Sequence, residues 1–306
     1  MSESHQPPIQ VLLDELETSR LKIARKYYAA YWCIGLGVMT FVICFCLEAF
    51  LVAFIEILIL IVMGSIMFSL GNKDRKQYRL AYKQGVVVNM LEGIDGNLQI
   101  NPNSGISPTD FVDNFLFGEK PDAYKTEDLV YGEIGKTTIH FAEVGAQSRG
   151  NRGYGDIFKG ILFCASFNKH FDGLTLVRPR HYTGSVVNWV SKQISGDGRV
   201  VDLENTEFNN TFFTQASNQV EARYLLTPAM MERLLALNQV AESDIFVSFV
   251  WSNIYIAFPL NHDYFEPPVF KSLLREDLLK KDIAILRLMY GIVEELDLNT
   301  RIWTKE

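Results

Sequence analysis

The sequence contains few of the patterns by which catalytic or metal-binding sites are recognised. It has four cysteines and five histidines, and none of them stands at the C-x-x-C or i, i+4 histidine spacing of a zinc site. A G-x-S-x-G elbow is missing, and no cysteine lies near a histidine as a catalytic nucleophile would need. We therefore expect no cofactor and no metal ion, and the sequence favours a protein that is not an enzyme without excluding one.

One stretch looks like part of a phosphate-binding loop but lacks its first glycine. Gly135–Thr137 matches the end of the G-x-x-x-x-G-K-[ST] pattern, whereas Val130 occupies the position of the first glycine. The backbone cradle of such a loop needs that glycine and a following helix. We instead predict a β-hairpin over Leu129–Ile134 and Thr137–Ala146, because the residues on both sides of the glycine alternate as strands do.

Negative charge dominates outside the first quarter of the chain. The net charge is −7, yet residues 1–76 hold seven basic and seven acidic residues, so the excess acidity lies in the remainder. An acidic domain repels the phosphate backbone of nucleic acids. We therefore expect no nucleic-acid partner.

The longest apolar run, Tyr27–Leu70, is unsuited to water. Glu48 and Glu56 are its only charged residues, and a helix that spans a bilayer needs about 20 mostly apolar residues. The run is long enough for two spans, which we place at Tyr28–Leu47 and Phe50–Leu70, joined by a tight turn around Glu48. A single span of this length would overshoot the hydrocarbon core about twofold, and a signal peptide has an apolar core of only about 7 to 15 residues.

Basic residues flank this run on both sides. Four precede it and five follow it: Arg20, Lys22, Arg25 and Lys26, then Lys73, Arg75, Lys76, Arg79 and Lys83. Because positive charge near span ends stays on the cytoplasmic side, we expect a helical hairpin in the membrane with both termini in the cytoplasm. Four aromatic residues occupy the place of the interfacial belt on that side, namely Tyr27, Tyr28, Tyr31 and Trp32.

Glu56 is an ionisable residue within the second predicted span. It lies about two helical turns from the turn around Glu48, near enough to the outer interface for its carboxylate to be hydrated. Carboxylates within membranes also mark contact sites. Two interpretations stay open, an interfacial carboxylate and a contact with a membrane-protein partner or with a second copy of the chain.

The remainder of the chain divides at turn-forming residues. Residues 1–26 contain an amphipathic helix that leads into the membrane, and residues 71–92 continue the second span as a helical stalk. Glycine, proline and asparagine then concentrate from Gly93 to Thr109, which marks the start of a cytosolic domain over residues 93–306. We expect one continuous domain there, although about 200 residues would also suffice for two lobes.

Helical and alternating patterns follow one another in this domain. Helices are predicted at Asp110–Phe117 with Thr109 as its N-cap, Val187–Ile194, Pro228–Gln239 with Thr227 as its N-cap, and Leu273–Leu296. Beyond the hairpin, strands are predicted at Asp156–Phe167, Thr175–Val177, Phe208–Gln215, Val220–Leu225, Ile245–Val250 and Ile254–Phe258. Hairpins interspersed with helices, without regular strand–helix alternation, indicate an α+β domain with a mostly antiparallel sheet.

A glycine-rich segment, Arg149–Gly155, joins two of the predicted strands. Its backbone N–H groups and the guanidinium groups of Arg149 and Arg152 suit contact with an anion or a partner. A hairpin loop without a ligand accounts for the same composition. In an enzyme, Asp156, His140 or His181 would supply the acid–base chemistry beside it.

Two groups of short patterns resemble a known family. They are Phe158-Lys159-Gly160 with Phe167-Asn168-Lys169, and Glu221-Ala222-Arg223-Tyr224 with Leu226-Thr227-Pro228. From the hairpin through Phe258, the sequence is similar to a bacterial integral-membrane family known as a domain of unknown function and often encoded beside LemA-type proteins. The resemblance implies a two-span protein of the bacterial inner (plasma) membrane with a cytosolic α+β domain, and it carries over no catalytic residues.

Two classes of function follow from these observations. The first, which we prefer, is a membrane-anchored interaction or scaffold module that binds a protein partner or self-associates. The second is a membrane-tethered enzyme, or a lipid- or anion-binding domain, that uses Arg149–Gly155. A pocket that joins this segment to a carboxylate or histidine with a strongly shifted pKa would favour the enzyme, and an exposed apolar patch would favour the module.

Overall fold

The computed structural model describes residues 9–46, 50–150, 153–167, 170–182, 199–241, 243–260 and 262–298. The chain divides into two compact units. The helical unit comprises Met1–Asn89 and Phe265–Lys280, and the sheet unit comprises Met90–Tyr264 and Lys281–Glu306. Each unit is described by itself below.

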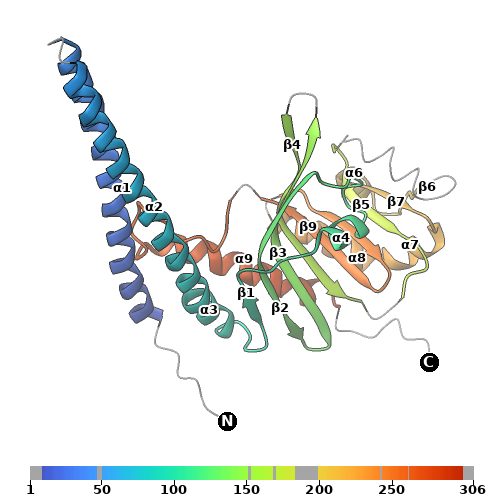
Figure 1. The fold of residues 1–306 in the computed structure, drawn as a ribbon. Coiled ribbons are helices and arrows are strands. Elements are labelled where there is room, and N and C mark those ends of the chain that lie inside the picture. Colours follow the sequence, from blue (N-terminus) through green and yellow to red (C-terminus); the bar gives the residue numbers. More distant parts are fainter. Residues whose placement is uncertain are drawn as a thin grey trace. The chain divides into compact units, whose positions relative to one another are not determined.

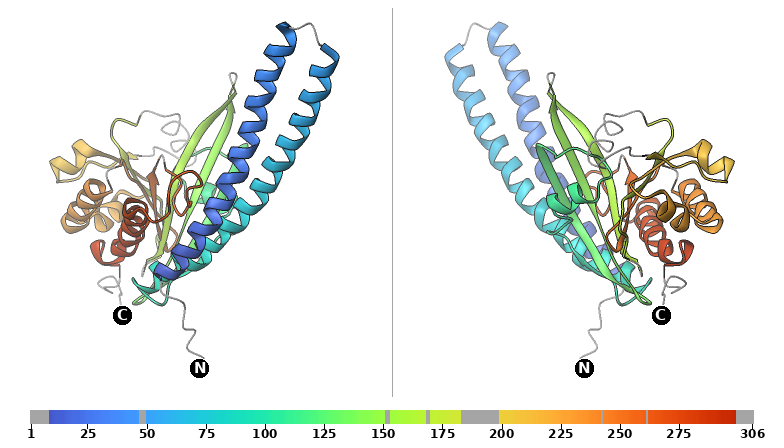
Figure 2. Two further views of the ribbon diagram at one scale, coloured as in Figure 1. Left: turned by 90° about the vertical axis from the view of Figure 1, so that its left-hand side faces the viewer. Right: turned by 90° about the vertical axis from the view of Figure 1, so that its right-hand side faces the viewer.

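Two long helices form most of the helical unit. Helix α1 spans Ile9–Cys46 and helix α2 spans Phe50–Tyr82, and they run side by side (Figure 2). Both helices are long and apolar enough to cross a membrane. Many of their large apolar side chains are exposed, as Ile34 and Leu51 illustrate, so the surface of these helices is apolar where a soluble helix would be polar. Helix α2 leads into a π-helical turn, η1 (Lys83–Val87), and then into α3 (Val88–Glu92).

The described part of the sheet unit contains a nine-stranded sheet in the order β1-β2-β3-β4-β9-β8-β5-β7-β6, in which every pair of neighbours is antiparallel (Figure 1). The strands are β1 (Gln99–Asn101), β2 (Ala123–Ile134), β3 (Thr137–Gly150), β4 (Gly153–Ser166), β5 (Thr175–Pro179), β6 (Arg199–Val200), β7 (Phe212–Ala216), β8 (Phe246–Val250) and β9 (Asn253–Pro259). The helices are α4 (Pro108–Asp113), α6 (Thr206–Thr211), α7 (Gln219–Leu225), α8 (Pro228–Val240) and α9 (Glu276–Glu295), whose first turn lies in the helical unit. The predicted α+β class with a mostly antiparallel sheet is confirmed.

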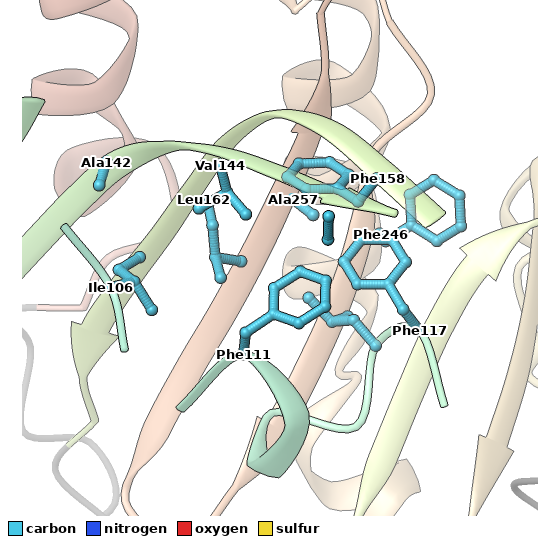
Figure 3. Packing of buried hydrophobic residues seen from close by; sticks show 11 residues of the cluster. Ile106, Phe111, Phe117, Ala142, Val144, Phe158, Leu162, Phe246 and Ala257 are labelled. Carbon is cyan, nitrogen blue, oxygen red and sulfur yellow. The ribbon is translucent and has the colours of Figure 1, made fainter. Parts of the chain in front are cut away.

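An aromatic cluster fills the space between α4 and the sheet (Figure 3). The ring of Phe117 stacks on that of Phe158 at 4.7 Å between centroids and approaches Phe111 and Phe246. Ala142, Val144 and Ala146 of β3 and Leu162 of β4 lie beneath these rings. Because successive side chains of a strand point to opposite faces, the residues between them on β3 lie on the other face of the sheet.

Two of the predicted strands are wrong in whole or in part, and side-chain caps explain both errors. The segment Val220–Leu225 is helical in α7, since the Asn218 side chain accepts hydrogen bonds from the backbone N–H groups of Val220 and Glu221 at 3.1 and 3.2 Å. In the segment Phe208–Gln215, only the part from Phe212 is a strand, because Asn205 caps α6 through Phe208 N at 2.9 Å. An asparagine cap favours a helical turn over the alternating pattern that follows it.

The start of α4 was also predicted wrongly. The N-cap is Ser107, whose Oγ accepts a hydrogen bond from Asp110 N at 3.0 Å, and Thr109 lies inside the helix. By contrast, Thr227 caps α8 as predicted, with Met230 N donating to its Oγ1 at 3.2 Å and Pro228 at the first helical position. The predicted helix Val187–Ile194 lies outside the described residues.

Arg178 of β5 is a buried cation in the sheet unit. Its side chain is 2% exposed, and its three guanidinium nitrogens form no hydrogen bond with the part of the chain that the structure describes. Burial lowers the pKa of this guanidinium to about 10. A charge that is removed from water without a partner destabilises the folded state.

We therefore expect Arg178→Met to stabilise the protein. Methionine keeps the buried length of the side chain and removes the desolvated charge, which should raise the free energy of unfolding by about 1–4 kcal/mol. Thermal unfolding of the full chain in detergent measures the change. The exposed Arg223 of α7 provides the control, since Arg223→Met should leave the midpoint nearly unchanged. A lower midpoint for Arg178→Met alone would mean that the guanidinium makes a favourable interaction in the native state.

Candidate functional site

An open cleft of about 410 Å³ lies over strands β2, β3 and β4 of the sheet unit. Its floor follows from the strand register, in which Gly145 of β3 pairs with Lys125 of β2 on one side and with Lys159 of β4 on the other. A side chain on Gly145 would meet no atom within 4 Å. The middle of the cleft is therefore bare backbone between two lysines.

Carboxylates occupy the rows on either side of this glycine. Glu127 pairs with Glu143 in one row, and Gln147 pairs with Asp156 in the other, where Gln147 Nε2 donates to Asp156 Oδ1 at 2.7 Å. The segment after β9 adds two further side chains to the lining, His262 and Asp263. The cleft thus presents positive and negative groups together.

Both lysines of the cleft form ion pairs with carboxylates, and both lysine side chains are exposed to solvent. Lys125 Nζ lies 2.7 Å from Glu127 Oε1, and Lys159 Nζ lies 3.3 Å from Asp263 Oδ1. The side chains of the second pair are 51% and 65% exposed. Exposed ion pairs of this kind contribute roughly 0–1 kcal/mol, so these groups can exchange their partners at little cost.

Glu143 has the most strongly perturbed carboxyl group of the cleft. Its side chain is partly buried, and one of its oxygens accepts a hydrogen bond from the backbone N–H of Tyr264. Burial raises the pKa of Glu143 to about 8, although the Tyr264 N–H opposes the shift, and the negative charges of Asp128 and Asp263 add to it. The carboxyl group can therefore release and accept a proton near neutral pH.

One of the sequence patterns that carried the family resemblance borders this cleft. Phe158 belongs to the aromatic cluster, Lys159 lines the cleft and Gly160 lies at the edge of it. Gly160 has φ +153°, and a side chain there would clash with the carbonyl oxygen of Phe258 on β9. Only glycine allows the two strands to approach this closely.

The structure separates the glycine-rich segment from this site. Arg149 is exposed on β3 next to the end of the hairpin, where its backbone N–H donates to Asp122 Oδ2 at 2.7 Å, and it does not line the cleft. Arg152 lies outside the described residues. Asp156, the strand neighbour of this segment, does line the cleft. The role of Arg149 and Arg152 as an anion or partner contact stays a prediction.

The remaining sequence candidates lie elsewhere. His140 is on β3 at an alternate position to Glu143, so it faces the other side of the sheet, and burial lowers its pKa. His181 forms an exposed pair with Asp244, 3.0 Å from Nε2 to Oδ2. Glu56 is exposed on α2 of the helical unit. Gly135 and Lys136 form the predicted hairpin turn, with Ile134 paired to Thr137 and φ +64° at Gly135.

Sequence reasoning missed most of the cleft. Glu143, Gly145 and Gln147 alternate with three small or apolar residues of β3, and this pattern was available as a signal for a polar face. Asp263 lies more than a hundred residues after its partner Lys159 in the sequence, and no local pattern connects the two residues.

Comparisons with known proteins give a family match and a similar solved structure. Residues 156–298 match the family model described as a protein of unknown function, DUF3137. No curated protein matches. Among solved structures, the chain is similar to the crystal structure of the mycobacterial trehalose monomycolate transport factor A, TtfA, with 8% sequence identity and a TM-score of 0.36 over 68% of this chain and 92% of that chain. The family match confirms the expected likeness to a domain of unknown function and includes most of β4 and all of β9.

The raised pKa of Glu143 predicts a pH-dependent stability. With a pKa near 8 in the folded state and near 4.5 in the unfolded state, the native protein binds the extra proton between these values. Its contribution to stability is complete below pH 4.5 and falls by up to about 1.4 kcal/mol per pH unit until pH 8. The melting temperature of Glu143→Gln should therefore fall less than that of the unmodified chain between pH 5 and pH 8.

Thermal unfolding in detergent, followed by tryptophan fluorescence, measures this difference. The exposed Glu133 on β2 offers a matched control, since Glu133→Gln should follow the unmodified chain. Identical pH profiles for Glu143→Gln and the unmodified chain would show that Glu143 does not hold a proton at neutral pH.

Proposed function

We propose that this protein is a membrane-anchored interaction module whose sheet unit binds a protein partner, or a second copy of the chain, through the cleft around Gly145. In this proposal α1 and α2 span the bacterial inner membrane as a hairpin, and both termini lie in the cytoplasm. The exposed apolar surfaces of the two helices support the anchor. The basic residues that flank Tyr27–Leu70 support the orientation.

The observation that carries the proposal is the bare glycine floor between Lys125 and Lys159. It leaves an open space with charges of both signs along its sides. An extended polypeptide segment suits this space, because its own charged side chains can replace the weak pairs that Lys125 and Lys159 now make. A free anion would gain less, since carboxylates line the same cleft.

A second function is favoured by one observation, the proton-exchanging carboxyl group of Glu143. A carboxyl group with a pKa near 8 in a cleft is typical of general acid–base catalysis. Asp156 and His262 line the same cleft and would contact a bound substrate. In such a membrane-tethered enzyme, binding depends on the open floor at Gly145, whereas the chemistry depends on the carboxyl group of Glu143.

The proposed orientation predicts the outcome of reporter fusions. A reporter that is active only in the cytoplasm should be active when it is fused after Glu306, and one that is active only in the periplasm should be inactive there. A fusion at Glu48, the proposed turn between the spans, should give the opposite pair of results. An active periplasmic reporter after Glu306 would contradict the hairpin.

Filling the floor of the cleft should abolish capture of the partner. In Gly145→Val, the new side chain enters open space in a β-strand, so the fold should persist while a docked segment is displaced. The full chain, purified from its native membrane in mild detergent, should retain a partner in stoichiometric amount by mass spectrometry. We expect Gly145→Val to reduce this amount at least tenfold.

Gly155→Val is the matched control for this experiment. Gly155 also lies in a strand of the same sheet, and a side chain there would likewise meet no atom within 4 Å, but it belongs to the glycine-rich segment and not to the cleft. Capture that survives Gly155→Val and fails in Gly145→Val supports the cleft. The reverse result would assign binding to Arg149–Gly155, and equal capture by all three chains would reject both sites.

A further inference from the structure

The segment Phe265–Lys280 belongs to the helical unit, although nearly all of the sheet unit separates it from α2 in the sequence. Hydrogen bonds fasten it to both helices. The Glu17 carboxylate of α1 accepts one from Leu273 N at 2.9 Å, Arg20 Nη1 donates to Val269 O at 2.9 Å, and Tyr78 OH of α2 donates to Pro268 O at 3.1 Å. These contacts fix the position of the segment along the two helices.

Buried charge pairs reinforce this attachment. Arg20 holds Glu17 through two hydrogen bonds of 2.9 and 2.8 Å, and this guanidinium keeps the pKa of Glu17 below its usual value. At the other end of the segment, Lys83 Nζ lies 2.9 Å from Glu266 Oε1, with the lysine side chain 4% exposed. Breaking a buried pair by removing one partner is strongly destabilising, so the segment is a fixed part of the unit.

Next to these attachments, two large apolar side chains of the segment are exposed to the outside. The ring of Phe270 packs against those of Tyr27, Tyr28 and Tyr31 with centroid distances of 5.8, 5.7 and 6.5 Å, yet the side chain is 51% exposed. Leu274 is 52% exposed. Phe270 thus extends the group of aromatic residues at the start of the apolar run, where membrane proteins place an interfacial belt.

Several cations follow or precede the aromatic group within about one helical turn along α1 and α2, and another lies next to Phe270 in the segment itself. They are exposed and form no ion pair with the part of the chain that the structure describes: Arg25, Lys73, Arg75, Lys76 and Lys271. Lys26 differs, because its Nζ is held by Asp74 Oδ2 at 2.5 Å. The patch therefore combines exposed aromatic and apolar side chains with uncompensated positive charge.

We propose that the Phe270 segment, residues 265–275, is an interfacial membrane contact that inserts Phe270 and Leu274 among the lipid headgroups while the surrounding cations bind anionic lipids. This inference rests on the proposed insertion of α1 and α2 in the membrane. A lipid surface with negative charge complements both features of the patch. A second copy of the chain is disfavoured as the occupant, because docking two such patches would bring like charges together.

A fluorescent label at position 270 tests the depth of the segment. The full chain with Cys33→Ala, Cys44→Ala, Cys46→Ala and Cys164→Ala receives one new cysteine by Phe270→Cys, which is labelled with an environment-sensitive dye. The chain is reconstituted in nanodiscs of phosphatidylcholine with one part in about four of phosphatidylglycerol. We expect strong quenching by a nitroxide near the headgroup, weaker quenching by one deep in the acyl chain, and protection from aqueous iodide.

Two further labelling positions separate this inference from the proposed anchor. A label at Leu58→Cys, near the middle of the predicted span Phe50–Leu70, should be quenched by the deep nitroxide, and a label at Val220→Cys, exposed on α7, should be quenched by iodide alone. In two contrary outcomes, the label at position 58 is quenched by the deep nitroxide as expected, while the label at position 270 is quenched by iodide, or is protected from iodide and from both nitroxides. Either result would mean that the interfacial contact is wrong and that the anchor stands. If Leu58→Cys is open to iodide, the anchor itself is wrong.

Lipid retention by chains with all four native cysteines provides a second readout. Native mass spectrometry of chains released from the same nanodiscs should show phosphatidylglycerol bound in preference to phosphatidylcholine. Arg25→Ala, Arg75→Ala and Lys271→Ala together should lower this preference by about five-fold for each cation removed. Arg223→Ala, Arg287→Ala and Lys120→Ala remove the same charges from exposed sites of the sheet unit and should leave it unchanged. An equal loss in both triple variants would overturn the role of these cations.

Discussion

The pleat of strand β3 is the constraint on which the sheet unit depends. Ala142, Val144 and Ala146 fill the aromatic cluster on one face, so the residues between them must face the other side. Those residues, Glu143, Gly145 and Gln147, line the cleft. A shift of one residue in register would move a carboxyl group into the aromatic cluster and expose the alanines, so the packing of the core also positions the cleft.

Most elements of the fold could be predicted from the sequence, because their patterns extend over many residues. The strands β3 and β4 are each 14 residues long, and α8 has a threonine–proline start that leaves little ambiguity. The errors fall on short segments. In α7, Val220, Ala222 and Tyr224 alternate like a strand, and the single side chain of Asn218 decides for a helix. Its carboxylate neighbour Glu221 then accepts hydrogen bonds from Asp172 and Gly173, a tertiary contact that periodicity cannot contain.

The candidate site was less accessible to sequence reasoning, since its groups come from distant parts of the chain. The polar residues of β3 were visible as a pattern, but the pairing of Lys159 with Asp263 and the contact of Tyr264 N with Glu143 arise only when β9 pairs with β4. The segment before α9 shows the same limit. Its sequence predicts the beginning of a helix in the cytosolic domain, whereas Leu273 donates a hydrogen bond to Glu17 of α1.

Burial gives the charges of the two units opposite roles. In the helical unit, Glu17 with Arg20 and Lys83 with Glu266 are largely removed from water, so removing one member of a pair takes away a partner of a charge that stays buried. Such pairs determine where a chain segment lies. In the cleft, Lys159 and Asp263 remain in contact with solvent, and their attraction is weak enough for another charged group to replace either one. An ion pair between a basic side chain and a carboxylate thus fixes the structure where it is buried. Where it is exposed to solvent, it leaves the surface available for binding.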